Sequence, residues 1–363
     1  MEGDSMFRNK NKTVFIILLL LILVITVTAC DNNDNKQKPQ DKSDIPEEKR
    51  SSFLMDTIVD IKVYGEKAEE IVEKSFARMR EIEDEMSRSK ESSYISKINK
   101  NAGKKAVKVD EDTFRVIEKA LKYAELTNGK FDPTIGPVVS LWGIGTKDAR
   151  VPSDQEINDT KNLVNYKMVE LNKDQRKVKL LKKNMKLDLG AIAKGYAADE
   201  VRKIMDENNA VSAFVNLGGN VLVYGDKTDG SLWNVGIQDP RESRGSVAGS
   251  IEVADKTIVT SGNYERYFKE DGKIYHHILN PDTGRPSRNN LLSVSIITKD
   301  SFDADVISTS AFILGLDKGM ELINNMDNVE AIFITDNLDV KTTPGLKGKV
   351  KILNSDFNLT EGD

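Results

Sequence analysis

The sequence predicts an α+β fold in which helices pack on a mixed, largely antiparallel sheet. Two amphipathic helices are expected early in the chain, and a long series of short strand-like runs follows them. These runs do not alternate regularly with helices, as they would in a parallel sheet. The only cysteine is Cys30, so no disulfide can form within the region after it, and the fold depends on its apolar core.

The first expected elements are one strand and two helices. Residues 53–64 alternate in polarity like a single strand. Apolar residues then recur at helical spacing over 68–87. They do so again over 110–127, where Asp112 or Thr113 is available as the N-cap.

Short strands dominate the rest of the chain. We expect a hairpin over 168–180, a helix over 191–208, and a strand over 213–224 that Gly218 and Gly219 interrupt. The remaining expected elements are strands at 186–189, 233–238, 249–253, 257–260 and 291–298, a helix around Asp305, a helix over 316–326, and strands near 330–335 and 349–353.

The N-terminal segment has the pattern of a targeting signal. Arg8, Lys10 and Lys12 precede an uncharged apolar run of 16 residues over 14–29, shorter than the ~20 residues that span hydrocarbon comfortably. The run ends in small residues before Cys30 and resembles a bacterial lipoprotein signal. We therefore expect 1–30 to be a signal peptide and Cys30 to be lipidated, which anchors an extracytoplasmic protein to the cell membrane. The alternative is an uncleaved membrane anchor.

The segment that follows the signal contains almost no apolar residue. Residues 31–50 are therefore expected to be a disordered tether, and 51–358 to be the folded domain. The net charge is -5, and no basic patch with interleaved aromatic residues occurs, which argues against nucleic acid as a partner. The sequence does not indicate an oligomeric state.

The first candidate site lies between His277 and Thr309. Histidine titrates between pH 5 and 8, so it suits a proton-transfer role, although a structural histidine is the alternative. Asp305 and Thr309 share one face of a helix, with Ser308 beside them. A carboxylate and hydroxyls are the hard oxygen ligands that Mg²⁺ prefers. His276 is the weaker candidate because, in an extended segment, it points to the opposite face.

Other segments could contribute to a phosphate-binding site. Residues 186–196 suggest a strand, a glycine turn and a helix start, with Asp188 and Lys194 as candidate contacts. An ordinary connection capped by Asp188 is the alternative. The rigid segment 131–137 could hold an aromatic ligand or be a structural loop. No phosphate-loop or dinucleotide-binding fingerprint occurs, so those two classes are disfavoured.

Seven separated motifs together resemble the ApbE family, a family of extracytoplasmic FAD:protein FMN transferases. They are FLMDT (53–57), FDPTIGP (131–137), LDLGAIAKGYAAD (187–199), NLGGN (216–220), TSGNYER (260–266), HILNPDTGRP (277–286) and DADVIST (303–309). The resemblance covers about 51–355 in collinear order. It implies an ApbE-like (T-fold-like) α+β domain.

The resemblance also implies roles for individual residues. The carbonyl of Ala191, with Asp305 and Thr309, resembles the family's Mg²⁺ site, and Ser308 stands where a further ligand can lie. The positions that resemble FAD contacts are Met55, Lys130, Phe131, Asp132, Asp188, Lys194 and Ile278. His277 resembles the histidine that assists the acceptor hydroxyl. Ser89 departs from the family pattern, because many members have an aromatic residue there that can stack on FAD.

The activity that the resemblance implies is Mg²⁺-dependent transfer of FMN from FAD to a threonine hydroxyl of an acceptor protein, with release of AMP. The implied acceptors are membrane or extracellular electron-transfer proteins with a short Gly/Ala/Thr-rich motif. Ser89 makes a side activity plausible, in which FAD is hydrolysed to FMN and AMP. The alternatives are therefore an FAD diphosphatase and a non-catalytic flavin-binding lipoprotein.

Overall fold

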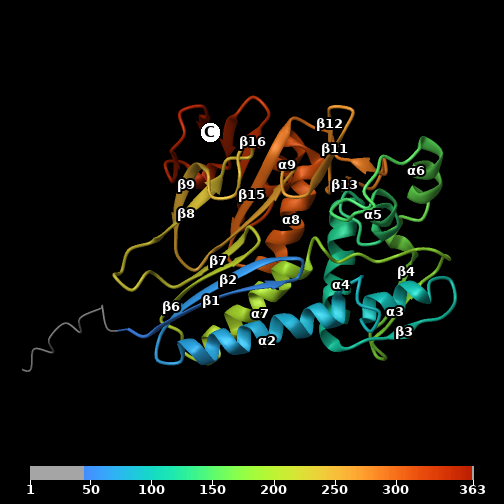
Figure 1. Ribbon diagram of the computed structural model, residues 1–363, viewed down its shortest axis with the longest axis horizontal. Coiled ribbons are helices and arrows are strands. Elements are labelled where there is room, and N and C mark those ends of the chain that lie inside the picture. The colour runs from blue at the N-terminus through green and yellow to red at the C-terminus, as the bar shows by residue number, and fades with distance from the viewer. Residues whose placement is uncertain (1–44, 362–363) are drawn as a thin grey trace, which may run out of the picture. The chain divides into compact units, whose positions relative to one another are not determined.

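The computed structural model describes residues 45–361, and the expected signal peptide, Cys30 and most of the expected tether lie outside this range (Figure 1). A nine-stranded sheet forms its centre, in the order β1-β2-β6-β7-β10-β15-β16-β17-β19. The strands are β1 (Glu47–Leu54), β2 (Thr57–Tyr64), β6 (Ser212–Leu217), β7 (Asn220–Tyr224), β10 (Thr257–Gly262), β15 (Leu291–Thr298), β16 (Glu330–Thr335), β17 (Asp339–Thr342) and β19 (Asn358–Glu361). Strand β1 includes residues 47–50, so the folded region begins earlier than residue 51, and the end of the expected tether is part of the sheet.

The expected sheet type is confirmed. Every neighbouring pair in the large sheet is antiparallel except β17 and β19, which run parallel. Strand β10 lies between β7 and β15, so segments that are distant in the sequence meet at the sheet centre. This placement brings Ser261, near the end of β10, close to the helix that follows β15.

The central strands are covered on both faces. Helices α2 (Ala68–Met86), α7 (Ala193–Glu207), α8 (Ser301–Leu314) and α9 (Leu316–Asn324) form one layer (Figure 1). Val259 and Ile296 pack with these helices, whereas their neighbours Ile258 and Ile297 pack toward a second sheet. That sheet has the order β18-β9-β8 and consists of β8 (Trp233–Gln238), β9 (Val247–Val253) and β18 (Val350–Ile352). The period-2 alternation of a strand thus fills two separate cores.

A smaller group of elements lies beside the large sheet and forms one wall of the site. It contains α3 (Tyr94–Lys100), α4 (Glu111–Leu126), α5 (Gly136–Trp142), α6 (Asp154–Lys161), β3 (Val107–Lys108), the 3₁₀ turn η2 (Tyr166–Met168), β4 (Val169–Asn172) and β5 (Lys177–Leu180). Trp142 is fully buried and its Nε1 donates to the carbonyl of Gly284 at 2.8 Å. This bond ties α5 to the segment after His277.

Short pieces complete the fold. The hairpin of β11 (Tyr267–Glu270) and β12 (Lys273–His276) precedes the pair of β13 (Leu279–Asn280) and β14 (Arg285–Pro286), and the 3₁₀ turn η3 (Pro344–Leu346) follows β17. Between residues 45 and 361, no helix combines the length and the apolar character needed to cross a membrane.

Three of the expected strands differ from the structure. The single strand at 53–64 is a hairpin, because Met55 and Asp56 adopt left-handed backbone angles (φ 52° and 59°). The strand at 213–224 is likewise a hairpin, turned at Gly218 and Gly219.

At 186–189, the structure has only an isolated bridge between Lys186 and Ile135. The N-cap of α4 is also not Asp112 or Thr113. It is Asp110, whose carboxylate accepts from the Thr113 backbone N–H at 2.7 Å.

Candidate functional site

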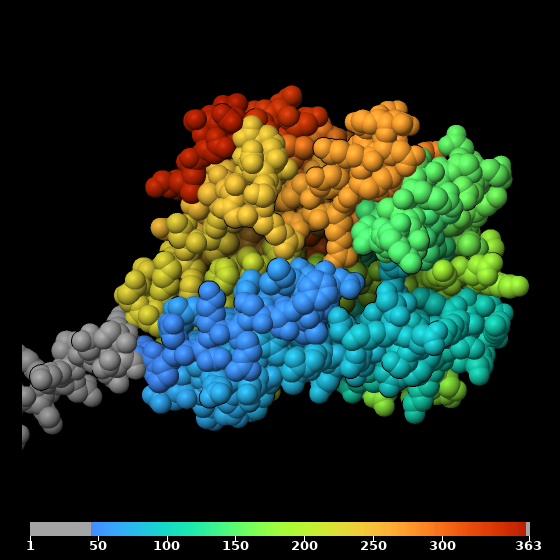
Figure 2. All heavy atoms as spheres, viewed as in Figure 1, coloured from blue at the N-terminus to red at the C-terminus, as the bar shows by residue number. Residues whose placement is uncertain are grey.

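A cavity of about 530 Å³ opens between the β1–β2 hairpin, the turn after β10 and the α5 region. Figure 2 shows the molecule hollowed between the blue N-terminal hairpin and the gold and orange segments above it. The lining comes from 53–58, 82–89, 130–144, 188–194, 218–220, 244, 260–266, 277–281 and 305–313. Each of the seven motifs noted in the sequence contributes at least one residue to this lining.

Asp305 is the one acid of helix α8 that lines the cavity, and it is only 3% exposed. The backbone N–H of Gly195 donates to its Oδ2 at 2.9 Å, and the Asn220 amide donates to its Oδ1 at 3.1 Å. Lys194 Nζ lies 3.4 Å from the same Oδ1. Three donors from α7 and β7 thus fix the carboxylate in one orientation. They also offset the cost of burying the carboxylate, because a buried charge without partners is strongly destabilising.

Close packing of α7 against α8 makes this arrangement possible. A Cβ added to Gly195 would lie 2.1 Å from the carbonyl oxygen of Ser301 and 2.8 Å from Cβ of Asp305. Asp199, one turn further along α7, accepts from the backbone N–H groups of Ser301 and Phe302, both at 2.9 Å. Burial, and next the charge of Asp300, raise the pKa of Asp199 to about 6.

Hydroxyl groups lie beside Asp305. Ser261 Oγ is 3.2 Å from Thr309 Oγ1 and 2.9 Å from Ser308 Oγ. Thr309 and Ala191 line the cavity, as expected. Ser308 does not, because it is fully buried and its Oγ donates to the Asp305 carbonyl at 3.0 Å.

The donor set is compatible with Mg²⁺. Among residues 45–361, no three His, Cys, Asp or Glu side chains gather as a metal site, and Asp305 is the only carboxylate among the expected ligands. Mg²⁺ usually binds one or two carboxylates and completes its shell with water and substrate phosphates. The Asp305 carboxylate, the Thr309 hydroxyl and the backbone at Ala191 fit that pattern, and all three residues line the cavity.

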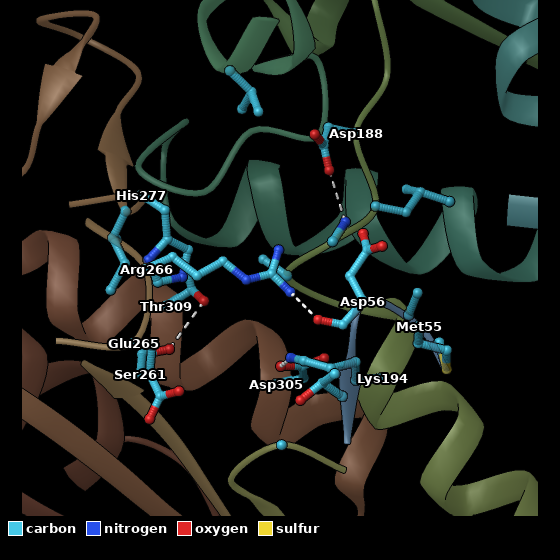
Figure 3. A pocket seen from close by; sticks show the side chains of 18 of the residues that line it. Met55, Asp56, Asp188, Lys194, Ser261, Glu265, Arg266, His277, Asp305 and Thr309 are labelled. Atoms are coloured by element: carbon cyan, nitrogen blue, oxygen red, sulfur yellow. Dashed lines mark hydrogen bonds and ion pairs between the residues drawn. The ribbon is translucent and has the colours of Figure 1, made fainter. Parts of the chain in front are cut away.

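His277 faces the same cavity from the other side (Figure 3). Its backbone N–H donates to the Arg266 carbonyl at 3.0 Å, while its Nδ1 is buried without a partner in the described part of the chain. Burial, followed by the charges of Arg266 and His276, lowers the pKa of His277 to about 3. The ring is therefore neutral at physiological pH and can accept a proton.

His276 points away from the cavity and has a structural role. Its Nε2 lies 2.8 Å from the Ser287 carbonyl, and its ring makes an edge contact with Phe312 at 5.7 Å between centroids. Burial lowers its pKa as well. As expected, His277 lines the cavity and His276 does not.

Three of the four charged residues expected to contact a ligand, Lys130, Asp188 and Lys194, form ion pairs around the cavity. Asp188 Oδ2 pairs with Arg88 Nε at 3.0 Å, and its Oδ1 accepts from the Gly190 N–H at 2.9 Å. Lys130 pairs with Asp282.

The remaining expected contacts form the walls. Phe131 and Ile278 are buried, and Met55 and Ser89 line the cavity near the end of α2. One carboxylate oxygen of Asp132 accepts from the Thr134 N–H of its own loop at 2.8 Å, and the other accepts from the Tyr166 N–H of η2 at 2.9 Å. Burial raises the pKa of Asp132. Asp132 therefore shapes the loop with its side chain.

The structure thus gathers every expected site residue of the described range at one cavity except Ser308. The lining residues that reasoning from the sequence did not select include Arg88, Asn220, Ser261 and Arg266. Asn220, Ser261 and Arg266 lie in the NLGGN and TSGNYER motifs. The sequence shows both motifs, but the spacing within them does not reveal which distant residues Asn220, Ser261 and Arg266 contact.

Fold and cavity together define an α+β domain with a nucleotide-sized cavity that combines a fixed carboxylate, hydroxyls and a neutral histidine. The ApbE family profile matches residues 55–333. The chain is 34% identical to the FAD:protein FMN transferase of Treponema pallidum (87% of this chain, 92% of the relative), and 34% identical to that of Klebsiella pneumoniae (86% and 96%).

Solved structures give the same result. The ApbE protein of Thermotoga maritima superposes with a TM-score of 0.75 at 35% identity, covering 85% of this chain and 98% of that one. The flavin transferase ApbE of Vibrio cholerae gives a TM-score of 0.72 at 27% identity (80% and 94%). The chain belongs to the ApbE family.

Proposed function

We propose that the protein is an FAD:protein FMN transferase, which moves FMN from FAD to a threonine hydroxyl of an acceptor protein and releases AMP. Membership of the ApbE family and the names of the curated relatives support the transferase class. The observation that carries the proposal is the convergence of Asp305, Thr309, Lys194 and His277 on one cavity of about 530 Å³. That volume is within the range of about 300–1,000 Å³ typical of small-molecule and cofactor sites.

The residues around Asp305 would manage the charge of the FAD diphosphate. When bound by Asp305, Thr309 and the carbonyl of Ala191, Mg²⁺ would neutralise charge on the diphosphate and on the departing phosphate. Lys194 adds a positive charge 3.4 Å from Asp305. The Gly195 and Asn220 donors hold the carboxylate in place before substrate arrives, so little reorganisation is needed.

The apolar walls would hold the flavin nucleotide. Ile278 and Phe131 present buried apolar surface, and Met55 closes the end near α2. The Lys130, Asp132 and Asp188 segments are proposed to position the polar parts of FAD. Positioning of this kind is a large part of catalysis in phosphoryl transfer.

His277 would assist the acceptor. The hydroxyl oxygen of the threonine forms a bond to the phosphorus on the FMN side, the anhydride P–O bond breaks, and its electron pair leaves with AMP. The hydroxyl proton passes to the neutral imidazole of His277. The bound diphosphate brings negative charge toward the ring, which raises the histidine pKa from about 3 and makes the ring a better base.

Ser89 favours hydrolysis of FAD as a second activity. It lines the cavity with a short hydroxyl side chain where no ring can stack on the ligand. Water in place of threonine would yield FMN and AMP.

A lipid on Cys30 would anchor the protein to the outer side of the cell membrane. Residues 31–44 would then connect the anchor to the domain, which would meet acceptors that are themselves membrane-bound or extracellular.

The test uses the full-length protein with FAD, Mg²⁺ and a threonine-containing acceptor peptide, followed by mass spectrometry. We expect FMN to be added to the peptide, and no addition when valine replaces the threonine or when EDTA is present. Free FMN without a labelled peptide would contradict the transferase and support the diphosphatase. Retained FAD with neither product would support a flavin-binding lipoprotein.

A further inference from the structure

The cationic side chains around the cavity differ in whether a carboxylate compensates their charge. Four of the five form an ion pair with a carboxylate, and these pairs are Arg88–Asp188, Lys130–Asp282, Lys194–Asp305 and Arg244–Glu265. Arg266 forms no ion pair with any carboxylate of residues 45–361. Its Nη2 donates instead to the backbone carbonyl of Asp56, at 2.8 Å. A neutral carbonyl satisfies one of its donors but leaves its charge uncompensated.

The position of Arg266 is fixed from both sides of the cavity mouth. Its own carbonyl accepts from the His277 N–H at 3.0 Å, so the two residues lie opposite each other just beyond the β11–β12 hairpin. The Asp56 carbonyl belongs to the left-handed turn at Met55 and Asp56, and the Met55 N–H donates to Glu83 of α2 at 2.8 Å. Figure 3 shows Arg266 reaching from beside His277 toward Asp56, with Lys194 and Asp305 nearby.

An exposed guanidinium without a carboxylate partner is suited to an anionic ligand. The planar fork of arginine binds phosphate oxygens in a bidentate manner, and such charge-assisted bonds are about twice as strong as neutral ones. A phosphate in the cavity would therefore be a better partner for Arg266 than the Asp56 carbonyl. The positive charge of Arg266 already acts on the site, since it contributes to the lowered pKa of His277.

We infer that Arg266 is a further catalytic residue, which leaves the Asp56 carbonyl when FAD enters and binds the diphosphate. This inference rests on the proposed function, because it takes FAD as the ligand. Arg266 then stabilises the negative charge that grows on the phosphate oxygens as the anhydride bond breaks. It shares this task with Lys194, which approaches from α7 on the Asp305 side.

The chain offers a matched control. Arg244 also lines the cavity and is exposed, but its charge is compensated by Glu265. Arg266→Gln and Arg244→Gln each remove one positive charge from the same region. Only the first removes an uncompensated charge.

The experiment measures equilibrium binding of FAD and of riboflavin, which lacks phosphate, to the full-length wild type and to both variants. We expect Arg266→Gln to weaken FAD binding roughly tenfold to a hundredfold, as for loss of a charge-assisted hydrogen bond, and to leave riboflavin binding unchanged. Arg244→Gln should change FAD binding less than threefold. Arg266→Lys should restore part of the FAD affinity, because it returns the charge without the fork.

Two outcomes would overturn the inference. The first is FAD binding by Arg266→Gln that equals the wild type. The second is an equal loss of FAD and riboflavin affinity, which would make Arg266 a residue that only supports the cavity wall. Failure of the proposed function has a different signature: the wild type would then label no acceptor, while the comparison of arginine variants in FAD binding would still decide the role of Arg266.

Discussion

Replacing Gly195 by alanine tests how the two helices of the site are held together. The added Cβ would lie 2.1 Å from the Ser301 carbonyl oxygen and 2.8 Å from Cβ of Asp305, where ordinary contacts begin at 3.4 Å. Both neighbours are part of, or directly attached to, the backbone of α8. The helices must therefore move apart by roughly 1 Å, and side-chain rotation cannot relieve the clash.

The magnitude follows from two opposing effects. Overpacking of this kind costs about 1–3 kcal/mol and occasionally more, and we take about 3–4 kcal/mol because both contacts are rigid. Gly195 is the third residue of α7, where alanine regains at most about 1 kcal/mol of intrinsic helix propensity. The net loss of about 2–3 kcal/mol lowers Tm by roughly 3–5 °C, since a domain of about 300 residues unfolds with an entropy near 0.6 kcal/mol per kelvin.

The same change should affect the Asp305 carboxylate. Separation of the helices lengthens the 2.9 Å hydrogen bond from the Gly195 N–H to Asp305. A hydrogen bond to a charged group contributes about 1.5–3 kcal/mol, so the Mg²⁺ concentration needed for half-maximal FMN release should rise roughly tenfold or more. The assays are differential scanning calorimetry without ligand and a Mg²⁺ titration of FMN release.

Gly190→Ala is the control for stability. Gly190 has no left-handed φ, and its added Cβ would meet only the Asp188 carboxylate oxygen, at 3.0 Å. We expect its Tm to stay within about 1 °C of the wild type, because this contact is with the end of a side chain that can shift slightly. A Gly195→Ala protein with unchanged Tm and unchanged Mg²⁺ dependence would refute the close-packing argument, as would an equal Tm loss in both variants.

Three further predictions concern charge and proton transfer. Asp305→Ala should abolish Mg²⁺-dependent FMN release and also the rise of Tm that Mg²⁺ produces in the wild type, measured by thermal shift; full activity would contradict the proposed metal ligand. His277→Ala should lower kcat about 10²- to 10⁴-fold while FAD affinity changes little, and equal losses in both would point to a binding role. Burial, together with Asp110 and Asp112, raises the pKa of Glu85 to about 8, so the folded state keeps this proton while the unfolded state loses it near pH 4.5. Its contribution to stability is complete below about pH 4.5 and is lost as the pH rises through about 8, and Glu85→Gln should flatten this decline when Tm is followed from pH 5 to 9.

Local patterns predicted many elements correctly. Helices α2 and α4 and strands β8 and β16 appear at or within one residue of the expected ranges, because amphipathic periodicity and alternation depend on neighbours in the sequence. The turn at Met55 was missed because methionine rarely adopts a left-handed conformation. That conformation is stabilised by Glu83, which is 28 positions away.

At the candidate site, too, the sequence predicted what depends on neighbouring residues and missed what depends on distant ones. The spacing of Asp305 and Thr309 placed both at the cavity, since residues four apart share a helical face. The same argument placed Ser308 beside them, but Ser308 is buried and does not line the cavity, because helical spacing does not say which neighbouring position faces the core. Arg266 was not selected, because its significance comes from the absence of a carboxylate partner in three dimensions.

The sequence by itself determined the α+β class, the lack of any disulfide within the domain, and the residue types that can act on a phosphate. These depend on composition and on short periodic patterns. Only the tertiary structure decided how Gly195, Asn220 and Lys194 fix the Asp305 carboxylate, because those contacts join α7 and β7 to α8. Likewise, the folded chain makes His277 neutral, since its low pKa arises first from burial and then from the charges of Arg266, His276 and Lys194, of which only His276 adjoins it in the sequence.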